Sequence, residues 1–221
     1  MPKTRFIVDA AQKAAQRSPV LLLAHGAGTP MDSAYLTSMA VLLAARGLTV
    51  ARFEFHYMAQ RRDGGTRRPP PRMEALTAEY RAAVATLRAR CPQAPLLIGG
   101  KSMGGRVASM IADAACGDDA VMGCVCLGYP FHPVKRPATL RTAHLIGMKC
   151  PSLIVQGERD PFGTRDELAQ VVLSNAITYA WIKSGDHDFK PLAASGLTQA
   201  QNLETAADVV ADWIGARIGK S

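Results

Sequence analysis

The stretch Gly100–Gly104, reading GKSMG, could serve either phosphate binding or acyl transfer. A phosphate-binding P-loop needs an earlier glycine, four residues and then Gly-Lys-Ser, because its backbone N–H groups wrap the phosphates. The place of that first glycine is taken by Pro95, which has no N–H to donate. The pattern Gly-x-Ser-x-Gly is complete, and it is typical of a serine nucleophile on a tight strand-to-helix turn. We therefore predict a nucleophilic Ser102, with Lys101 pointing away from the site and having no role.

A serine hydroxyl attacks efficiently only when a base takes its proton and a third group orients that base. Asp160 in LIVQGERDPFG and His187 in GDHDF follow later apolar runs, in a chain order of serine, acid, histidine that is found in known triads. Asp186 and Asp188 flank the histidine, but sequence neighbours seldom curl round to meet the same ring, so Asp160 is the expected acid. The other histidines fit the role of base less well: His25, His56, His132 and His144.

Short apolar runs alternate with amphipathic segments of helical length, a pattern typical of βαβ units. The expected strands cover 20–24, 49–55, 96–99, 121–127, 152–156 and 178–183. The expected helices cover 32–46, 73–90, 103–115, 165–173 and 198–218. We predict a single α/β domain with a mostly parallel sheet and helices on both faces. In such sheets the carboxyl ends of the strands meet at one edge, where His25–Gly28, Ser102, Asp160 and His187 would gather.

The segments LLLAHGAG, IGGKSMGGRVAS, LIVQGERDPFG and GDHDF resemble the α/β-hydrolase superfamily, in particular its small dienelactone-hydrolase-like members. The likeness is greatest to a bacterial branch known as alpha/beta family hydrolases. Its eukaryotic relatives are testis-expressed proteins and a subunit of a chromatin acetyltransferase complex. The resemblance runs from about Val20 to the C-terminus.

This resemblance implies a role for each matching residue. Ser102 would be the nucleophile, His187 the general base and Asp160 the acid that orients it. The backbone N–H groups of Ala27 and Met103 would form the oxyanion hole. Dienelactone hydrolases carry a cysteine as nucleophile, so the serine here argues against their substrate while leaving acyl transfer in place. A serine hydrolase of carboxylic esters or thioesters is the expected function.

The interval between Gly128 and Pro151 has room only for a brief helix around 140–146. We therefore expect a minimal lid or none, and an open, shallow site. Aromatic residues after the fourth predicted strand are expected to wall the site, although they would suit packing beneath the loop equally well. The expected substrate contacts are His25, Gly26, Tyr129, Phe131, Arg61 and Arg62.

Half of the formal charge of +8 lies between Arg61 and Arg72, where five arginines stand against one aspartate. The glycines and prolines of this segment predict a loop, which is either simply solvated or forms a rim of the site that attracts anions. An alternative function follows: a non-catalytic interaction module that binds an acidic protein or nucleic acid through this loop. The segment lacks the interleaved aromatic residues that single-strand binding platforms use. A small acyl substrate is therefore the expected partner, with neither nucleic acid nor membrane.

With 221 residues, 48% hydrophobic and 20% charged, the chain has the composition of one globular domain. We assign it to residues 19–221, with 1–18 as an N-terminal extension or edge strand. No apolar run approaches the roughly 18 residues of a membrane span, and the first residues lack a signal peptide's apolar core, so a cytoplasmic protein is expected. The five cysteines form no C-x-x-C pair and are expected to be free thiols. No metal or other cofactor is expected, and the protein would be a monomer or homodimer.

Overall fold

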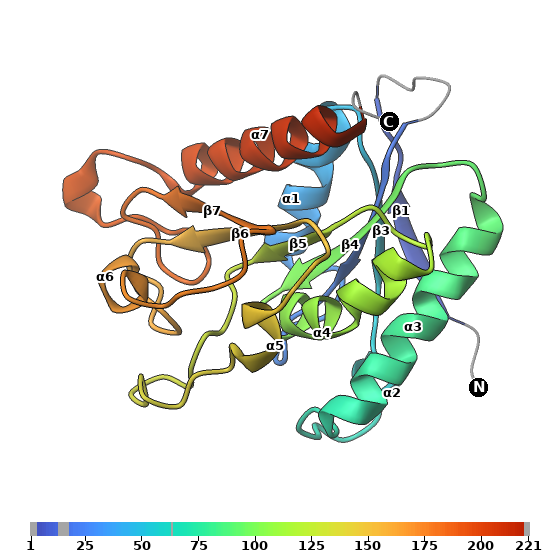
Figure 1. Ribbon diagram of the computed structural model, residues 1–221, viewed down its shortest axis with the longest axis horizontal. Helices are drawn as coiled ribbons and strands as arrows, with labels where there is room; N and C mark the ends of the chain where they lie inside the picture. Colours follow the sequence, from blue (N-terminus) through green and yellow to red (C-terminus); the bar gives the residue numbers. More distant parts are fainter. Residues whose placement is uncertain (1–3, 13–17, 63, 219–221) are drawn as a thin grey trace.

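The computed structural model describes residues 4–12, 18–62 and 64–218. One seven-stranded sheet forms its centre, in the order β1-β3-β2-β4-β5-β6-β7 (Figure 1). Neighbouring strands are parallel except β1, which pairs antiparallel with β3. The strands are β1 (Phe6–Asp9), β2 (Val20–Ala24), β3 (Thr49–Phe53), β4 (Leu96–Lys101), β5 (Cys124–Leu127), β6 (Ser152–Gly157) and β7 (Ile177–Ile182).

Helices cover both faces of the sheet, which explains why its inner strands are buried and mostly apolar. Helices α1 (Ala34–Ala45) and α7 (Gln199–Ile218) pack on one face, and α3 (Met73–Arg90) and α4 (Met103–Gly117) on the other (Figure 1). Alternate residues of β2 illustrate the division, since Leu22 packs toward α3 and α4 while Leu21 and Leu23 pack toward α1 and α7. The α/β prediction with helices on both faces is confirmed.

Four short helices complete the described fold: α2 (His56–Arg62), α5 (Ala143–Ile146), α6 (Arg165–Leu168) and the 3₁₀ helix η1 (Ala193–Ser195). Helix α2 was not expected, and it places Arg61 and Arg62 in a helical turn rather than in the arginine-rich loop. Helix α6 is shorter than the predicted 165–173. Only α5 interrupts the described chain between β5 and β6, so no lid domain stands over the strand ends.

Of the N-terminal segment 1–18, residues 6–9 form the edge strand β1, while 1–3 and 13–17 lie outside the described residues. Within the described chain, no helix is long and apolar enough to cross a membrane.

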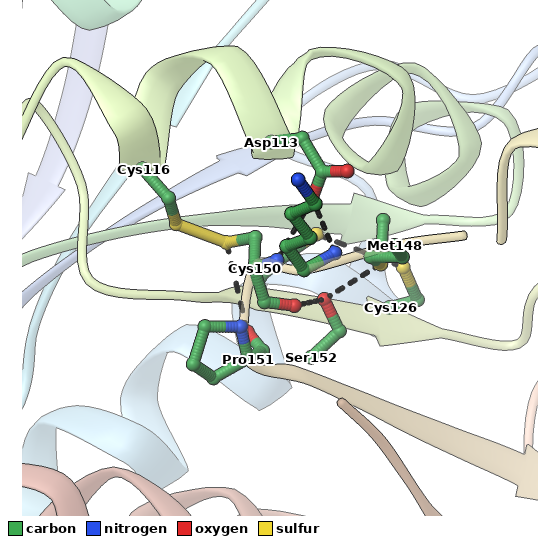
Figure 2. The surroundings of a disulfide bond; sticks show 9 residues. Asp113, Cys116, Cys126, Met148, Cys150, Pro151 and Ser152 are labelled. Carbon is green, nitrogen blue, oxygen red and sulfur yellow. Dashed lines mark hydrogen bonds between the residues drawn. A yellow bond between two sulfur atoms is a disulfide. The ribbon is translucent and has the colours of Figure 1, made fainter. Parts of the chain in front are cut away.

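The expectation of five free cysteines is wrong for one pair. Cys116, near the end of α4, is joined to Cys150, just before β6 (Figure 2). The packing of α4 against this segment brings their Cα atoms within 5.8 Å, although 34 residues separate them in the sequence. Asp113 strengthens the same junction, because its Oδ1 accepts hydrogen bonds from the N–H groups of Lys149 and Cys150. Cys91, Cys124 and Cys126 are free.

Candidate active site

Ser102 stands on a sharp turn between β4 and α4. Its φ of 53° and ψ of −117° place it in a region that residues with a side chain seldom adopt. The turn is tight because β4 and α4 both lie against β2. A Cβ on Gly100 or Gly104 would lie 2.6 or 2.5 Å from the carbonyl oxygen of Ala24. The two glycines of the motif are therefore required by close backbone approach.

Asp160 and His187 meet at the neighbouring strand ends. Oδ2 of Asp160 lies 2.8 Å from Nδ1 of His187. The carboxylate is fully buried, and Phe162 N–H donates to its Oδ1 at 2.9 Å while the Gln156 amide donates to Oδ2 at 3.0 Å. An imidazole that donates through Nδ1 leaves Nε2 free to accept a proton, as a general base requires.

The two aspartates beside the histidine have other partners. Asp186 Oδ1 accepts from the N–H groups of Asp188 and Lys190, and Asp188 forms an ion pair with Lys101. Among the described residues, Asp160 is thus the carboxylate that the fold brings to the His187 ring.

Residues 184–189, here called the His187 segment, pack directly beside the end of β4. A Cβ added to Gly128 would lie 3.3 Å from Cε1 of His187 and 3.1 Å from Nζ of Lys101. The ring of Phe162 flanks the imidazole at a centroid distance of 4.5 Å. Phe162 and Gly128 thus border the histidine.

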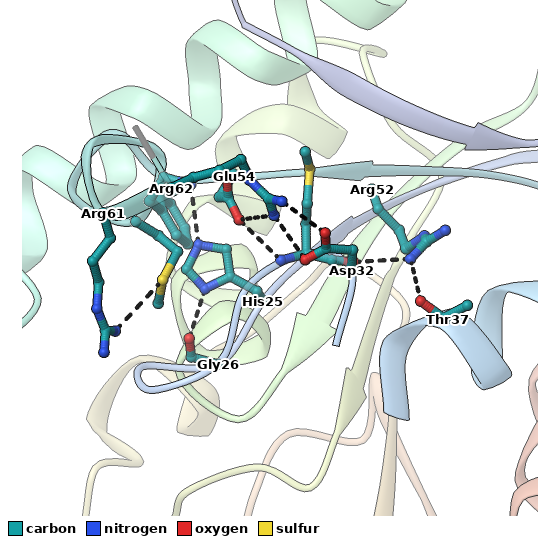
Figure 3. Close-up of polar contacts among 11 residues, drawn as sticks. His25, Gly26, Asp32, Thr37, Arg52, Glu54, Arg61 and Arg62 are labelled. Atoms are coloured by element: carbon teal, nitrogen blue, oxygen red, sulfur yellow. Dashed lines mark hydrogen bonds and ion pairs between the residues drawn. The ribbon is translucent and has the colours of Figure 1, made fainter. Parts of the chain in front are cut away.

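The turn His25–Gly28 lies on the side of Ser102 that faces away from His187. A Cβ on Gly26 would lie 3.7 Å from Cβ of Ser102. Phe55 N–H donates to Nε2 of His25, so the ring carries its proton on Nδ1 and donates it to the carbonyl of Gly26 (Figure 3). Burial lowers the pKa of His25 and keeps the ring neutral. The hydroxyl of Tyr57 donates to the carbonyl of Ala27 at 2.9 Å.

Three of the expected substrate contacts lie beneath the site rather than in it. His25, Tyr129 and Phe131 are each fully buried. His25 supports the turn, and the aromatic pair packs edge to face with ring centroids 4.7 Å apart. These side chains shape the site from below, because no part of them reaches the surface.

Arg61 and Arg62 differ sharply despite being neighbours (Figure 3). The guanidinium of Arg62 bonds Asp32 at 2.7 Å and Glu54 at 2.9 Å, and the bond to Arg62 lowers the pKa of Asp32. Arg61 contacts only the sulfur of Met58, at 3.6 Å, among the described residues. A hollow of about 260 Å³ lies between them and the His25–Gly28 turn; it is lined by Gly28, Pro30, Met58, Arg61 and Arg62.

Two buried polar residues were missed by the sequence analysis. Gln156 lies inside the apolar β6, where a lone amide is a signal of a buried hydrogen-bond network. Lys101 was expected to point away, but its ammonium is buried and donates to the carbonyl of His187 at 2.7 Å. The position of this lysine at the end of an apolar strand could have indicated such contacts, since a lysine is seldom buried without partners.

A second serine–histidine contact joins Ser109 of α4 to His144 of α5, at 2.9 Å. The Ser109 hydroxyl donates its one proton to the carbonyl of Arg106, so His144 Nε2 must be the donor to Ser109. That polarity is opposite to the one needed to activate a serine.

No group of three or more potential metal ligands occurs in the described part of the chain.

Comparison with known proteins agrees with this fold. The model of a family described as "alpha/beta hydrolase domain" matches residues 17–215. The fold is similar to that of a dienelactone hydrolase from Anabaena variabilis, with a TM-score of 0.68 and 20% identity over 98% of each chain. An alpha-beta serine hydrolase homologue from Coxiella burnetii gives a TM-score of 0.68 and 17% identity over 93% of this chain and 95% of that one. A serine hydrolase without a lid from Xanthomonas campestris gives 0.63 and 17%, over 94% and 93%.

Proposed function

The chain belongs to the alpha/beta hydrolase family, and from this we propose that it is a serine hydrolase that cleaves carboxylic ester or thioester bonds. The observation that carries the proposal is the hydrogen bond of 2.8 Å between the buried Asp160 and His187, at the strand ends that also hold Ser102 in its strained turn. A buried carboxylate on Nδ1 and a serine at a strand-to-helix turn are the arrangement that acyl transfer uses.

In the proposed reaction, Ser102 Oγ attacks the substrate carbonyl carbon while its proton passes to Nε2 of His187. The carbonyl electron pair moves onto oxygen and returns as the bond to the leaving alcohol or thiol breaks, and that group takes the proton from His187. Water then gives a proton to His187 and attacks the acyl-enzyme. The bond between Ser102 Oγ and the acyl carbon then breaks, Oγ takes the proton back from His187 and the acid is released, while Asp160 stabilises the imidazolium in both halves.

Two backbone N–H groups suit the transient oxyanion. Met103 is the first residue of α4, so its N–H has no partner within the helix. Ala27 lies in the turn that packs against Ser102 and is fixed from behind by Tyr57. One such donor typically lowers the barrier by about 3–4 kcal/mol.

The proposed substrate carries an anionic group on its acyl or leaving part. Arg62 is neutralised by Asp32 and Glu54, whereas Arg61 borders the hollow beside the Ala27 turn with no carboxylate partner among the described residues. A guanidinium in such a position binds a carboxylate or phosphate through charge-assisted hydrogen bonds.

Within the family, we place the chain with the small dienelactone-hydrolase-like enzymes and the bacterial branch related to testis-expressed proteins, on the strength of the sequence motifs alone. We further propose a catalytic domain of residues 19–221 and a cytoplasmic monomer or homodimer. Its partner would be a small acyl substrate, without nucleic acid or membrane.

Labelling with a fluorophosphonate probe, read by mass spectrometry of the intact protein, tests the proposal. We expect one adduct on Ser102 that is absent in Ser102→Ala. In Asp160→Asn, labelling should slow by roughly 10⁴-fold because the imidazole loses its orientation. A folded wild-type protein that takes up no probe would contradict the proposal, and normal labelling of Asp160→Asn would move the acid to Asp186 or Asp188.

The substrate class is tested with Arg61→Gln and two p-nitrophenyl esters, the neutral acetate and the anionic hemisuccinate. Loss of a hydrogen bond between charged groups costs about 1.5–3 kcal/mol. We therefore expect kcat/KM for the hemisuccinate to fall by roughly ten- to a hundredfold, with little change for the acetate. The exposed Arg68→Gln is the matched control. Equal effects on both esters would contradict an anion site at Arg61.

A further inference from the structure

Lys101 connects two parts of the site that come from distant segments of the chain. It is the last residue of β4, directly before Ser102, and its side chain is only 5% exposed. Its ammonium donates to the carbonyl oxygen of His187 at 2.7 Å and lies 3.2 Å from Oδ1 of Asp188. The ring of Tyr35 lies beneath it, with its centroid 5.2 Å from Nζ. We propose that Lys101 is a positioning residue, whose ammonium holds the His187 segment at the strand end that carries Ser102.

Burying an ammonium costs free energy, so packing alone does not explain a lysine here. A methionine would fill similar space without that cost. Burial lowers the pKa of Lys101, and the nearby carboxylates of Asp188 and Asp160 oppose this shift. The ammonium is compensated by one carbonyl, one carboxylate and one aromatic face, and the carbonyl belongs to His187 itself.

The His187 segment depends on such anchors because its backbone is unusual. Ser184 and Phe189, at its two ends, both have positive φ values, 56° and 63°. Asn202 of α7 fixes the far end by donating to the carbonyl of Phe189 at 2.8 Å. Between the two ends, Lys101 is the donor to the His187 carbonyl within the described chain. Asp160 and Lys101 therefore restrain the same residue, one at its ring and the other at its main chain.

The inference rests on the proposed function, in which His187 is the general base. A shift of about 1 Å in a catalytic group can lower a rate on the order of 10²-fold. The titratable groups that face the ammonium come from three parts of the fold: Tyr35 of α1, Asp160 after β6, and Asp186, His187 and Asp188 of the histidine segment.

The test compares Lys101→Met with Lys190→Met, which removes an exposed lysine directly after the His187 segment. In Lys101→Met we expect kcat and the fluorophosphonate labelling rate to fall on the order of 10²-fold. KM should change by less than about threefold, because the residue holds the histidine and not the substrate. Lys190→Met should behave as the wild type.

Thermal unfolding separates this role from a purely structural one. The melting temperature of Lys101→Met should stay close to that of the wild type, because the gain from removing a buried charge is offset by the donor that the His187 carbonyl loses. Wild-type kcat in Lys101→Met would overturn the proposal. If Lys101→Met does not fold, Lys101→Gln decides, since it lacks the charge: labelling at least tenfold slower supports the proposal and wild-type labelling overturns it.

One further measurement distinguishes failure of this inference from failure of the proposed function. The proton on Nδ1 of His187, hydrogen-bonded to the buried Asp160, should give a downfield NMR signal whether or not the protein hydrolyses esters. If the wild type takes up no probe, the proposed function fails, but this signal still reports how the ring is held. A shifted or broadened signal in Lys101→Met supports positioning by Lys101, and an unchanged signal overturns it.

Discussion

Gln156 links the two turns that frame the histidine. Its amide nitrogen donates to Asp160 Oδ2, to the carbonyl of Tyr129 and to that of Gly163, and its oxygen accepts from Tyr129 N–H at 2.7 Å. The side chain is fully buried, so water cannot reach these polar groups and hydrogen bonds within the protein must satisfy them. One residue therefore sets the position of the acid relative to the turn after β5.

Gln156→Leu keeps the approximate size of this side chain, but it leaves the N–H of Tyr129 without its acceptor and removes the amide donor from Asp160 Oδ2 and from the carbonyl of Gly163. Because unsatisfied buried polar groups cost about 1–3 kcal/mol each, the free energy of unfolding should fall by about 2–4 kcal/mol. Urea denaturation at 25 °C measures this. Gln170→Leu, on the surface, is the control and should change stability by less than about 0.5 kcal/mol. Equal stability of the two variants would contradict the network.

At the scale of elements, the close contact of α4 with β2 depends on glycine. A Cβ on Gly104 would lie 2.5 and 2.6 Å from the carbonyl oxygens of Ala24 and His25, well inside van der Waals contact. At the other end of the same helix, a Cβ on Gly117 would meet nothing within 4 Å. The backbone of the helix therefore approaches the carbonyl groups of the sheet closely at Gly104, next to Ser102, whereas at Gly117 there is room for a side chain.

We expect Gly104→Ala to lower the free energy of unfolding by about 1–3 kcal/mol, because α4 must move away from β2. The same substitution at Gly117 should raise it by about 0.5–1 kcal/mol, since alanine loses less backbone entropy in a helix. Chemical denaturation of the two variants beside the wild type measures both values. Equal effects would mean that close approach at Gly104 is unimportant.

The length and burial of each element explain whether it could be predicted from the sequence. The bounds of β2 and α3 agree with the prediction because apolar runs and helical periodicity are strong signals in long or fully buried segments. Helix α2 was missed because it has seven residues and leads into a segment rich in glycine and proline. The order of the residues along the chain was enough to predict that Asp160 and His187 would meet. The contacts of Lys101 and Gln156 could not be predicted, because they depend on how the loops fold back over the strand ends.

For the whole molecule, the distribution of charge matters more than its sum of +8. Within the arginine-rich segment, Arg62 is already paired with Asp32 and Glu54, which removes one cation from the rim. Arg67, Arg68 and Arg72 are exposed in a stretch with no aromatic residue on which a base could stack. Such a surface attracts polyanions only weakly and without sequence preference.

Fluorescence anisotropy with a labelled single-stranded oligonucleotide tests this at 0.15 M salt. We expect a Kd no tighter than about 10⁻⁶ M, weakening steeply as salt is added, as for non-specific electrostatic binding. Nanomolar binding that persists at high salt would favour the interaction module over the enzyme. The Ser102→Ala variant should give the same curve as the wild type, since the serine carries no charge.

The site is divided along the chain. Residues 25–62 supply the turn and the hollow beside Arg61, while the nucleophile, acid and base all follow β4. The halves meet where Ala24 of β2 pairs with Gly100 of β4. The proposed substrate contact and the proposed triad are thus encoded in separate stretches of the gene. Recombination between the His25–Gly28 turn and β4 would exchange the segment that carries Arg61 and leave the oxyanion donors, nucleophile, acid and base of the proposed reaction in place, which offers evolution, or an engineer, a simple route to new substrates.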